Sequence, residues 1–157
     1  MTIKFQNHLE KLGLKSSDLV VSDNFYLFEF VPKKIIDIYG LEAINFIPNK
    51  IITIAQLIRT LSDGPIFINN YHIGGRLHYR GMRYPMYKLG AKDSRHKLNV
   101  FNEKNKYFQF DAIDFHSNEL TIFQLYDLIL KNESTFLKLG LRRIEKPNFT
   151  KGFQSLL

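Results

Sequence analysis

One amphipathic helix is the most tightly specified element of this 157-residue chain. Its apolar residues recur at intervals of three and four, which is the spacing of a single buried helical stripe. The stripe consists of Ile51, Ile54, Ala55, Ile58 and Leu61. Pro48 starts this element, and Asp63-Gly64-Pro65 stops it. The chain must therefore fold so that other elements cover this stripe.

A short run of alternating polar and apolar residues is the second constraint: Asp111-Ala112-Ile113-Asp114-Phe115-His116. In a strand, this alternation puts Asp114 and His116 on one face. Ile113 and Phe115 then lie on the opposite face, toward a core. Further strands are predicted at residues 19–31, 66–70 and 141–145, where aromatic and branched residues are frequent.

The remaining segments favour helices or turns. Residues 3–14 have the pattern of a short amphipathic helix, and residues 35–46 are capable of forming a helix. Thr121 followed by Gln124 fits a capping box at the start of another helix, and residues 132–140 turn the chain back. The sum is an α+β domain with a small, mostly antiparallel sheet and helices packed against it.

Composition and charge limit the possible partners. The net charge is +7 and the pI is about 9.5, which favours anionic partners such as an acidic protein surface, a cell-wall polymer or nucleic acid. Much of the excess lies between residues 76 and 106. Because there are no cysteines, any metal site must use histidine and carboxylate ligands. We expect a protein made in the cytoplasm without a signal peptide and without a membrane span.

His96 and Asp114 are candidate metal ligands. A neutral imidazole and a carboxylate that converge from separate elements are the beginning of a catalytic zinc site, which needs three protein ligands and one open position. The alternative is a surface histidine beside a half-buried strand with ordinary acidic side chains. Spacing alone leaves both interpretations open.

The order S-x-H followed by A-x-D, here Ser94 to His96 and Ala112 to Asp114, resembles the zinc D-Ala-D-Ala carboxypeptidase and L-alanyl-D-glutamate peptidase family. This family shares its fold with the hedgehog signalling domain and is common among phage endolysins. The likeness covers roughly residues 21 to 153, with residues 1–20 as an N-terminal extension. Gly74-Gly75 and residues 79–83 resemble the arginine-bearing loop of the phage-type members.

The resemblance implies a role for each motif residue. His96 and Asp114 would bind zinc, and Glu145 would be the general base. Arg80 or Arg83 would bind a substrate carboxylate or polarise the scissile carbonyl. If the site is active, the resemblance implies a zinc metallopeptidase that cleaves peptidoglycan peptides.

Two departures from the family pattern bear on that activity. The segment between His96 and Asp114 holds an insertion at about residues 99–110, within a single domain at residues 21–157. The family's third zinc ligand follows its last strand, but Phe153 and Ser155 stand here where Trp and His would. A substitute third ligand could come from His116 or His72. We therefore expect no cofactor, with zinc present only if a non-family ligand completes the site.

The expected function is that of a non-catalytic structural or interaction subunit. It would be built on a degenerate zinc-peptidase fold, as a phage virion component of the tail or connector kind, with other protein chains as partners. Tyrosine, phenylalanine and arginine are enriched at protein interfaces. The predicted interface residues are Tyr71, Tyr79, Tyr84, Tyr87, Arg95, Tyr107 and Phe108. The alternatives are an active zinc peptidoglycan peptidase and, less favoured, nucleic-acid binding through the basic loop.

Overall fold

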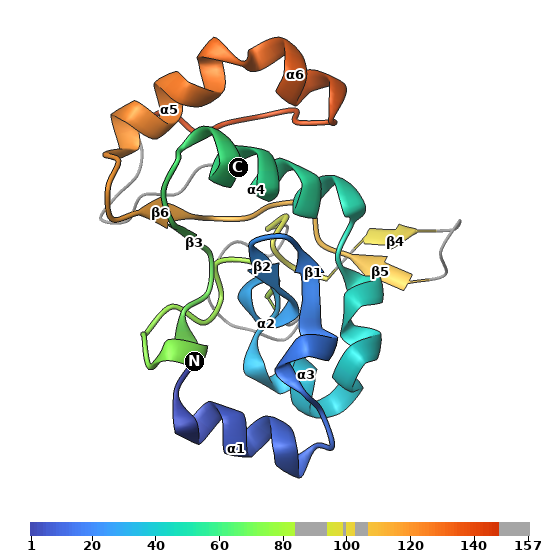
Figure 1. The fold of residues 1–157 in the computed structure, drawn as a ribbon. Helices are drawn as coiled ribbons and strands as arrows, with labels where there is room; N and C mark the ends of the chain where they lie inside the picture. The colour runs from blue at the N-terminus through green and yellow to red at the C-terminus, as the bar shows by residue number, and fades with distance from the viewer. Residues whose placement is uncertain (84–93, 99, 103–106, 148–157) are drawn as a thin grey trace.

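The computed structural model describes residues 1–83, 94–98, 100–102 and 107–147 and confirms the α+β class (Figure 1). The α-helices are α1 (Ile3–Lys11), α2 (Leu27–Phe30), α3 (Lys33–Tyr39), α4 (Asn49–Leu61), α5 (Ile122–Lys131) and α6 (Glu133–Lys138). Short 3-10 helices are η1 (Ser16–Leu19), η2 (Gly40–Phe46) and η3 (Tyr71–Ile73). The strands are β1 (Val20–Ser22), β2 (Phe25–Tyr26), β3 (Ile66–Phe67), β4 (Val100–Asn102), β5 (Tyr107–Gln109) and β6 (His116–Ser117).

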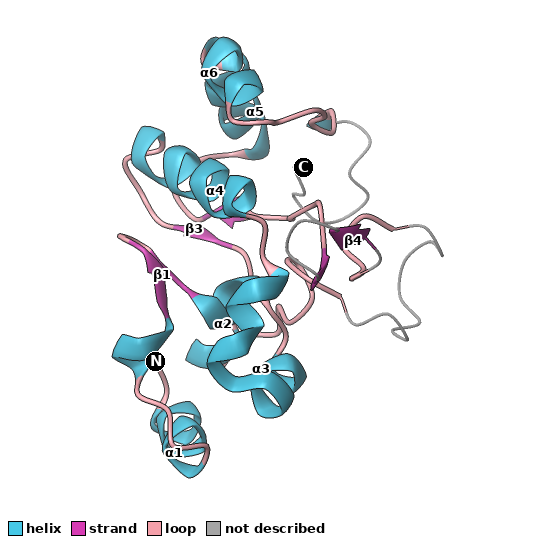
Figure 2. Cartoon of the chain, turned by 90° about the vertical axis from the view of Figure 1, so that its right-hand side faces the viewer, coloured by secondary structure: helices cyan, strands magenta, loops and turns pink. Residues whose placement is uncertain are grey.

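The described strands form three separate antiparallel pairs rather than the one small sheet that we predicted. β1 pairs with β2, β3 with β6, and β4 with β5. The β4–β5 hairpin occupies the insertion that separates His96 from Asp114. Figures 1 and 2 both show α1 at one end of the molecule and α5 with α6 at the other, with α4 and β3 between them.

Four of the five residues of the predicted stripe of α4 are buried, and the fifth, Leu61, is half-buried and packs against the same core. Ile51, Ile54, Ala55 and Ile58 are all buried. The largest fully buried side chains include six phenylalanines: Phe25, Phe28, Phe30, Phe110, Phe115 and Phe136. Each such ring stabilises the fold by about 1.5–3 kcal/mol through the apolar surface removed from water. Phe5 and Leu9 of α1 belong to the same core, so the N-terminal extension packs against the domain.

Four local predictions were wrong. Residues 27–30 form the helical turn α2 instead of a strand, and the Glu29 carboxylate caps this turn by accepting a hydrogen bond from the Tyr26 N–H at 2.9 Å. Residues 133–138 form α6 where we predicted a turn, and this helix ends at Lys138, two residues before Gly140, which has a φ of 95°. Residues 141–145 are extended but have no strand partner among the described residues. Of residues 111–116, only His116 belongs to a strand.

Two other local predictions are confirmed. Thr121 and Gln124 form the reciprocal capping box of α5, with the Gln124 N–H donating to Thr121 Oγ1 at 3.3 Å. The alternation before β6 also holds, because Ile113 and Phe115 are fully buried while Asp114 and His116 are half-buried. No described helix is both long enough and apolar enough to cross a membrane.

Glu29 makes the stability of this core depend on pH. Burial raises the pKa of its carboxyl group from 4.5 to about 7, against the hydrogen bond from the Tyr26 backbone, which lowers it. Between pH 4.5 and about pH 7, Glu29 has lost its proton in the unfolded chain but retains it in the folded chain. The free energy of unfolding therefore decreases as pH rises through this range. The total loss is about 3 kcal/mol, completed just above pH 7.

We expect Glu29→Gln to remove this loss, because the amide oxygen can still accept from Tyr26 and carries no charge. The measurement is urea unfolding of both proteins at pH 5 and pH 7.5. The variant should gain stability relative to the parent protein between the two values. An equal pH response of the two proteins would show that Glu29 is not held in the protonated form.

Candidate functional site

Backbone hydrogen bonds between distant segments hold the site together. Residues 80–83 lie between the α2 turn and the segment before β6, because the Met82 N–H donates to the Phe30 carbonyl at 2.7 Å and the Asp114 N–H donates to the Arg80 carbonyl at 2.7 Å. The Arg83 N–H donates to the His96 carbonyl at 2.6 Å. These contacts bring the predicted arginines, histidine and carboxylate into one place.

Asn69, which the sequence analysis did not single out, connects this frame to the core. Its side chain is fully buried, and its Oδ1 accepts from the Arg80 N–H at 3.0 Å while its Nδ2 donates to the Val31 carbonyl at 3.3 Å. A polar residue directly after a short apolar strand was the available signal. Because the amide satisfies two backbone groups that are far apart in the sequence, it fixes the start of the arginine-bearing loop.

His96 and Asp114 lie together, as predicted. The His96 Nε2 atom is 3.2 Å from Asp114 Oδ1, and both side chains are largely buried. The other ring nitrogen, Nδ1, lies 2.9 Å from the Gly81 carbonyl, which can only accept, so Nδ1 carries a hydrogen. Nε2 can then donate to Asp114 only when the ring is doubly protonated, in which case the contact is an ion pair.

Each of the two predicted arginines contacts one predicted ligand: Arg83 contacts Asp114, and Arg80 contacts His116. The Arg83 guanidinium donates to Asp114 Oδ2 at 3.2 Å and to the Tyr79 carbonyl at 2.9 Å. Arg80 is buried, and its guanidinium lies 2.9 Å from His116 Nδ1, which must therefore be the acceptor. Burial lowers the pKa of the His116 imidazole below its ordinary value, and the charge of Arg80 lowers it further.

The described residues do not fit the zinc site that the resemblance implies. Both carboxylate oxygens of Asp114 already face a partner, namely His96 and Arg83. Across the part of the chain that the structure describes, no three histidine, aspartate or glutamate side chains gather in a metal-binding arrangement. A catalytic zinc needs three such ligands. We therefore assign no step to a metal.

Neither proposed substitute ligand completes the site. The Nδ1 atom of His116 accepts from Arg80, as described above. His72 is buried among aromatic rings, with its centroid 4.5 Å from that of Phe28, and its Nδ1 atom has no hydrogen-bond partner among the described residues. Burial lowers the pKa of His72 to about 4, and the N-terminal amino group lowers it further. Its place is the aromatic core near α1.

The predicted interface residues have different environments. The prediction that Tyr71 lies at an interface is wrong for this chain. Its side chain is buried, and its hydroxyl donates to the Val31 carbonyl at 3.0 Å. Tyr79 is half-buried and Arg95 is exposed. Tyr84 and Tyr87 lie outside the described residues, as do Phe153 and Ser155. Tyr107 and Phe108 are in β5.

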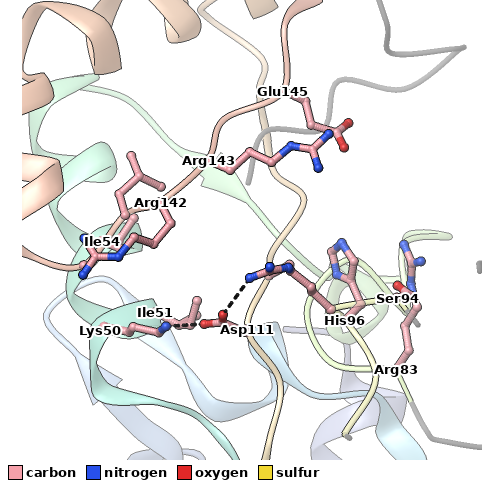
Figure 3. Close-up of a pocket in the computed structure, with 14 residues that line it drawn as sticks. Lys50, Ile51, Ile54, Arg83, Ser94, His96, Asp111, Arg142, Arg143 and Glu145 are labelled. Atoms are coloured by element: carbon pink, nitrogen blue, oxygen red, sulfur yellow. Dashed lines mark hydrogen bonds and ion pairs between the residues drawn. The ribbon is translucent and has the colours of Figure 1, made fainter. Parts of the chain in front are cut away.

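A cleft of about 650 Å³ opens beside His96 and Arg83. Figure 3 shows residues from distant parts of the chain converging on it, with the first turns of α4 on one side and Arg142, Arg143 and Glu145 on another. Asp111 lines the cleft and pairs with Lys50 and with Arg95, the latter at 3.3 Å. The predicted general base, Glu145, also lines the cleft and is exposed.

Sequence reasoning missed most of this cleft. Lys50, Asp111, Arg142 and Arg143 come from segments up to 93 positions apart, and each alone resembles an ordinary surface charge. The structure thus adds a charged cleft to the predicted His96–Asp114 pair, while the peptidase family itself stays a prediction. Comparisons with known protein families, with curated proteins and with solved structures find no match to this chain.

Proposed function

We propose that this protein is a non-catalytic interaction subunit, built on a fold that resembles the zinc peptidases. One observation carries the proposal: arginine guanidinium groups occupy the positions next to the candidate ligands. Arg83 contacts Asp114, and Arg80 contacts His116. A fixed positive charge within hydrogen-bond distance of a carboxylate opposes the approach of a divalent cation to the same group.

Other protein chains are the partners that we propose, and the abundance of the resembled family among phages favours a virion assembly as the setting. A fold can keep its core while its surfaces acquire other work. The positive net charge of the chain suits docking on acidic neighbours, where electrostatic complementarity fixes orientation and favours encounter.

The active zinc peptidase remains the second candidate because of one geometric detail. The Nδ1–H of His96 donates to a backbone carbonyl, at 2.9 Å, which is the arrangement that orients many metal-binding imidazoles.

Zinc binding and peptide hydrolysis separate the two candidates. We expect the purified protein to retain less than about one zinc per ten chains after dialysis, because two ligands do not make a stable site. We also expect no cleavage of muropeptides, with an active peptidase of the resembled family as the positive control. One zinc per chain that is lost in His96→Ala, together with muropeptide cleavage that this substitution abolishes, would establish the peptidase instead.

A further inference from the structure

The cleft beside His96 has an excess of positive charge. Among the residues that the structure describes, its lining carries five cationic side chains against two carboxylates, an excess of three positive charges. The cationic residues are Lys50, Arg83, Arg95, Arg142 and Arg143. The carboxylates are those of Asp111 and Glu145. Asp114, just behind the lining, balances Arg83, which leaves an excess of two.

Arg142 and Arg143 are the cations available to a ligand. Both are exposed, and neither forms an ion pair with another described residue, in contrast to Lys50, Arg83 and Arg95. Figure 3 shows both side chains at the cleft, on the extended segment that follows Gly140. The two side chains point in opposite directions from this segment, so each guanidinium offers its own pair of N–H donors to a separate carboxylate.

The floor of the same cleft is aliphatic. Ile51 and Ile54 of α4 line it, together with Ala112 and Leu141. Apart from the His96 imidazole, the described lining residues include no aromatic ring on which a nucleic-acid base could stack. A ligand that matches both features carries carboxylates and aliphatic side chains together.

We infer that the cleft is the docking site for an acidic peptide segment of a partner protein. Its carboxylates contact Arg142 and Arg143, and an aliphatic side chain next to them contacts the floor at Ile51 and Ile54. The volume of about 650 Å³ lies within the usual range of ligand pockets, about 300–1,000 Å³. This inference rests on the proposed function as an interaction subunit, and it names the partner's chemistry.

Fluorescence anisotropy with defined probes tests the inference. The probes are a fluorescein-labelled octapeptide of alternating Glu and Leu, the same peptide with Gly in place of Leu, and an oligothymidylate of matched charge. We expect the Glu–Leu peptide to bind most tightly, about tenfold tighter than the Glu–Gly peptide, because only its leucines reach the aliphatic floor. The oligothymidylate should bind more weakly than either, since the described lining offers no phenylalanine or tyrosine ring on which its bases could stack.

The double variant Arg142→Glu/Arg143→Glu should weaken binding of the Glu–Leu peptide by about 100-fold, because two attractive contacts become repulsive. Lys4→Glu/Arg76→Glu is the matched control, since it makes the same change of net charge at two exposed residues outside the cleft. Its effect should be below about threefold. Circular dichroism spectra confirm that each variant is folded.

Equal weakening by the two double variants would overturn the inference, because binding would then follow net charge alone. Tighter binding of the oligothymidylate would overturn it in favour of a nucleic-acid site. Absence of peptide binding in a protein that also lacks zinc would defeat this inference and leave the proposed function standing. Stoichiometric zinc with muropeptide cleavage would instead defeat the proposed function, whatever the anisotropy shows.

Discussion

Replacing Asp114 by Ala should lower the free energy of unfolding by about 3 kcal/mol. Its side chain is only 17% exposed and contacts both His96 and Arg83. Removing the carboxylate leaves the Arg83 guanidinium, and the buried Arg80 nearby, without the negative charge that balances them. A largely buried charge that loses its partner is strongly destabilising. Urea unfolding at pH 7 measures the change.

Asp111→Ala is the matched control for Asp114→Ala. Asp111 also pairs with two cations, but Arg95 is 72% exposed and Asp111 itself 29% exposed, so water replaces the lost contacts. Asp111→Ala should therefore lower the free energy of unfolding by less than about 1 kcal/mol. The double variant Asp114→Ala/Arg83→Met should recover part of the lost stability. Equal costs for Asp111→Ala and Asp114→Ala would show that the Asp114 cluster is an ordinary surface group.

Gly81→Ala should cost about 3 kcal/mol or more, through steric overlap. A Cβ atom at this position would overlap the Phe30 carbonyl oxygen, which also accepts the hydrogen bond from Met82. Relief requires residues 80–83 to move away from α2. That movement would shift the Gly81 carbonyl, which orients the His96 ring at 2.9 Å. Thermal and urea unfolding measure the loss, and the ¹H–¹⁵N NMR signals of the imidazole report the ring.

Gly13→Ala separates this steric cost from the conformational cost of losing a glycine. Gly13 has a φ of 71°, and an added Cβ there would meet nothing within 4 Å. Its cost should be about 1 kcal/mol, which is the strain of a left-handed alanine. If Gly81→Ala is no worse than Gly13→Ala, then the close approach of residues 80–83 to Phe30 does not constrain the site.

Local sequence patterns were sufficient for some parts of this fold and insufficient for others. The stripe of α4, the capping box of α5 and the alternation at Ile113 to Phe115 depend on nearest neighbours along one element, and all three were predicted correctly. The helical turn at α2 was missed because the aromatic residues of 27–30 favour strands, whereas the cap from Glu29 outweighs that preference. The missed signal was itself local, because Glu29 lies only three residues after Tyr26.

The candidate site was predictable only in part. The proximity of His96 and Asp114 followed from the family resemblance, across an insertion that forms the β4–β5 hairpin. The contact of Arg83 with Asp114 spans 31 residues and depends on the position of residues 80–83 over the Phe30 carbonyl. A periodic pattern in the sequence cannot predict a contact between residues so far apart. The cleft was not predicted for the same reason, because its lining residues also come from distant segments.

Asp111 gives the cleft a resident counter-ion. Its carboxylate already forms ion pairs with Lys50 and Arg95. An incoming anion must therefore share these two cations with Asp111 or displace its carboxylate. At Lys50 and Arg95, an anion therefore exchanges one ion pair for another and gains little. Arg142 and Arg143 are exposed and have no such counter-ion among the described residues, so an anion meets them without that exchange. Asp111 thus favours anion contacts at Arg142 and Arg143 over contacts at Lys50 and Arg95.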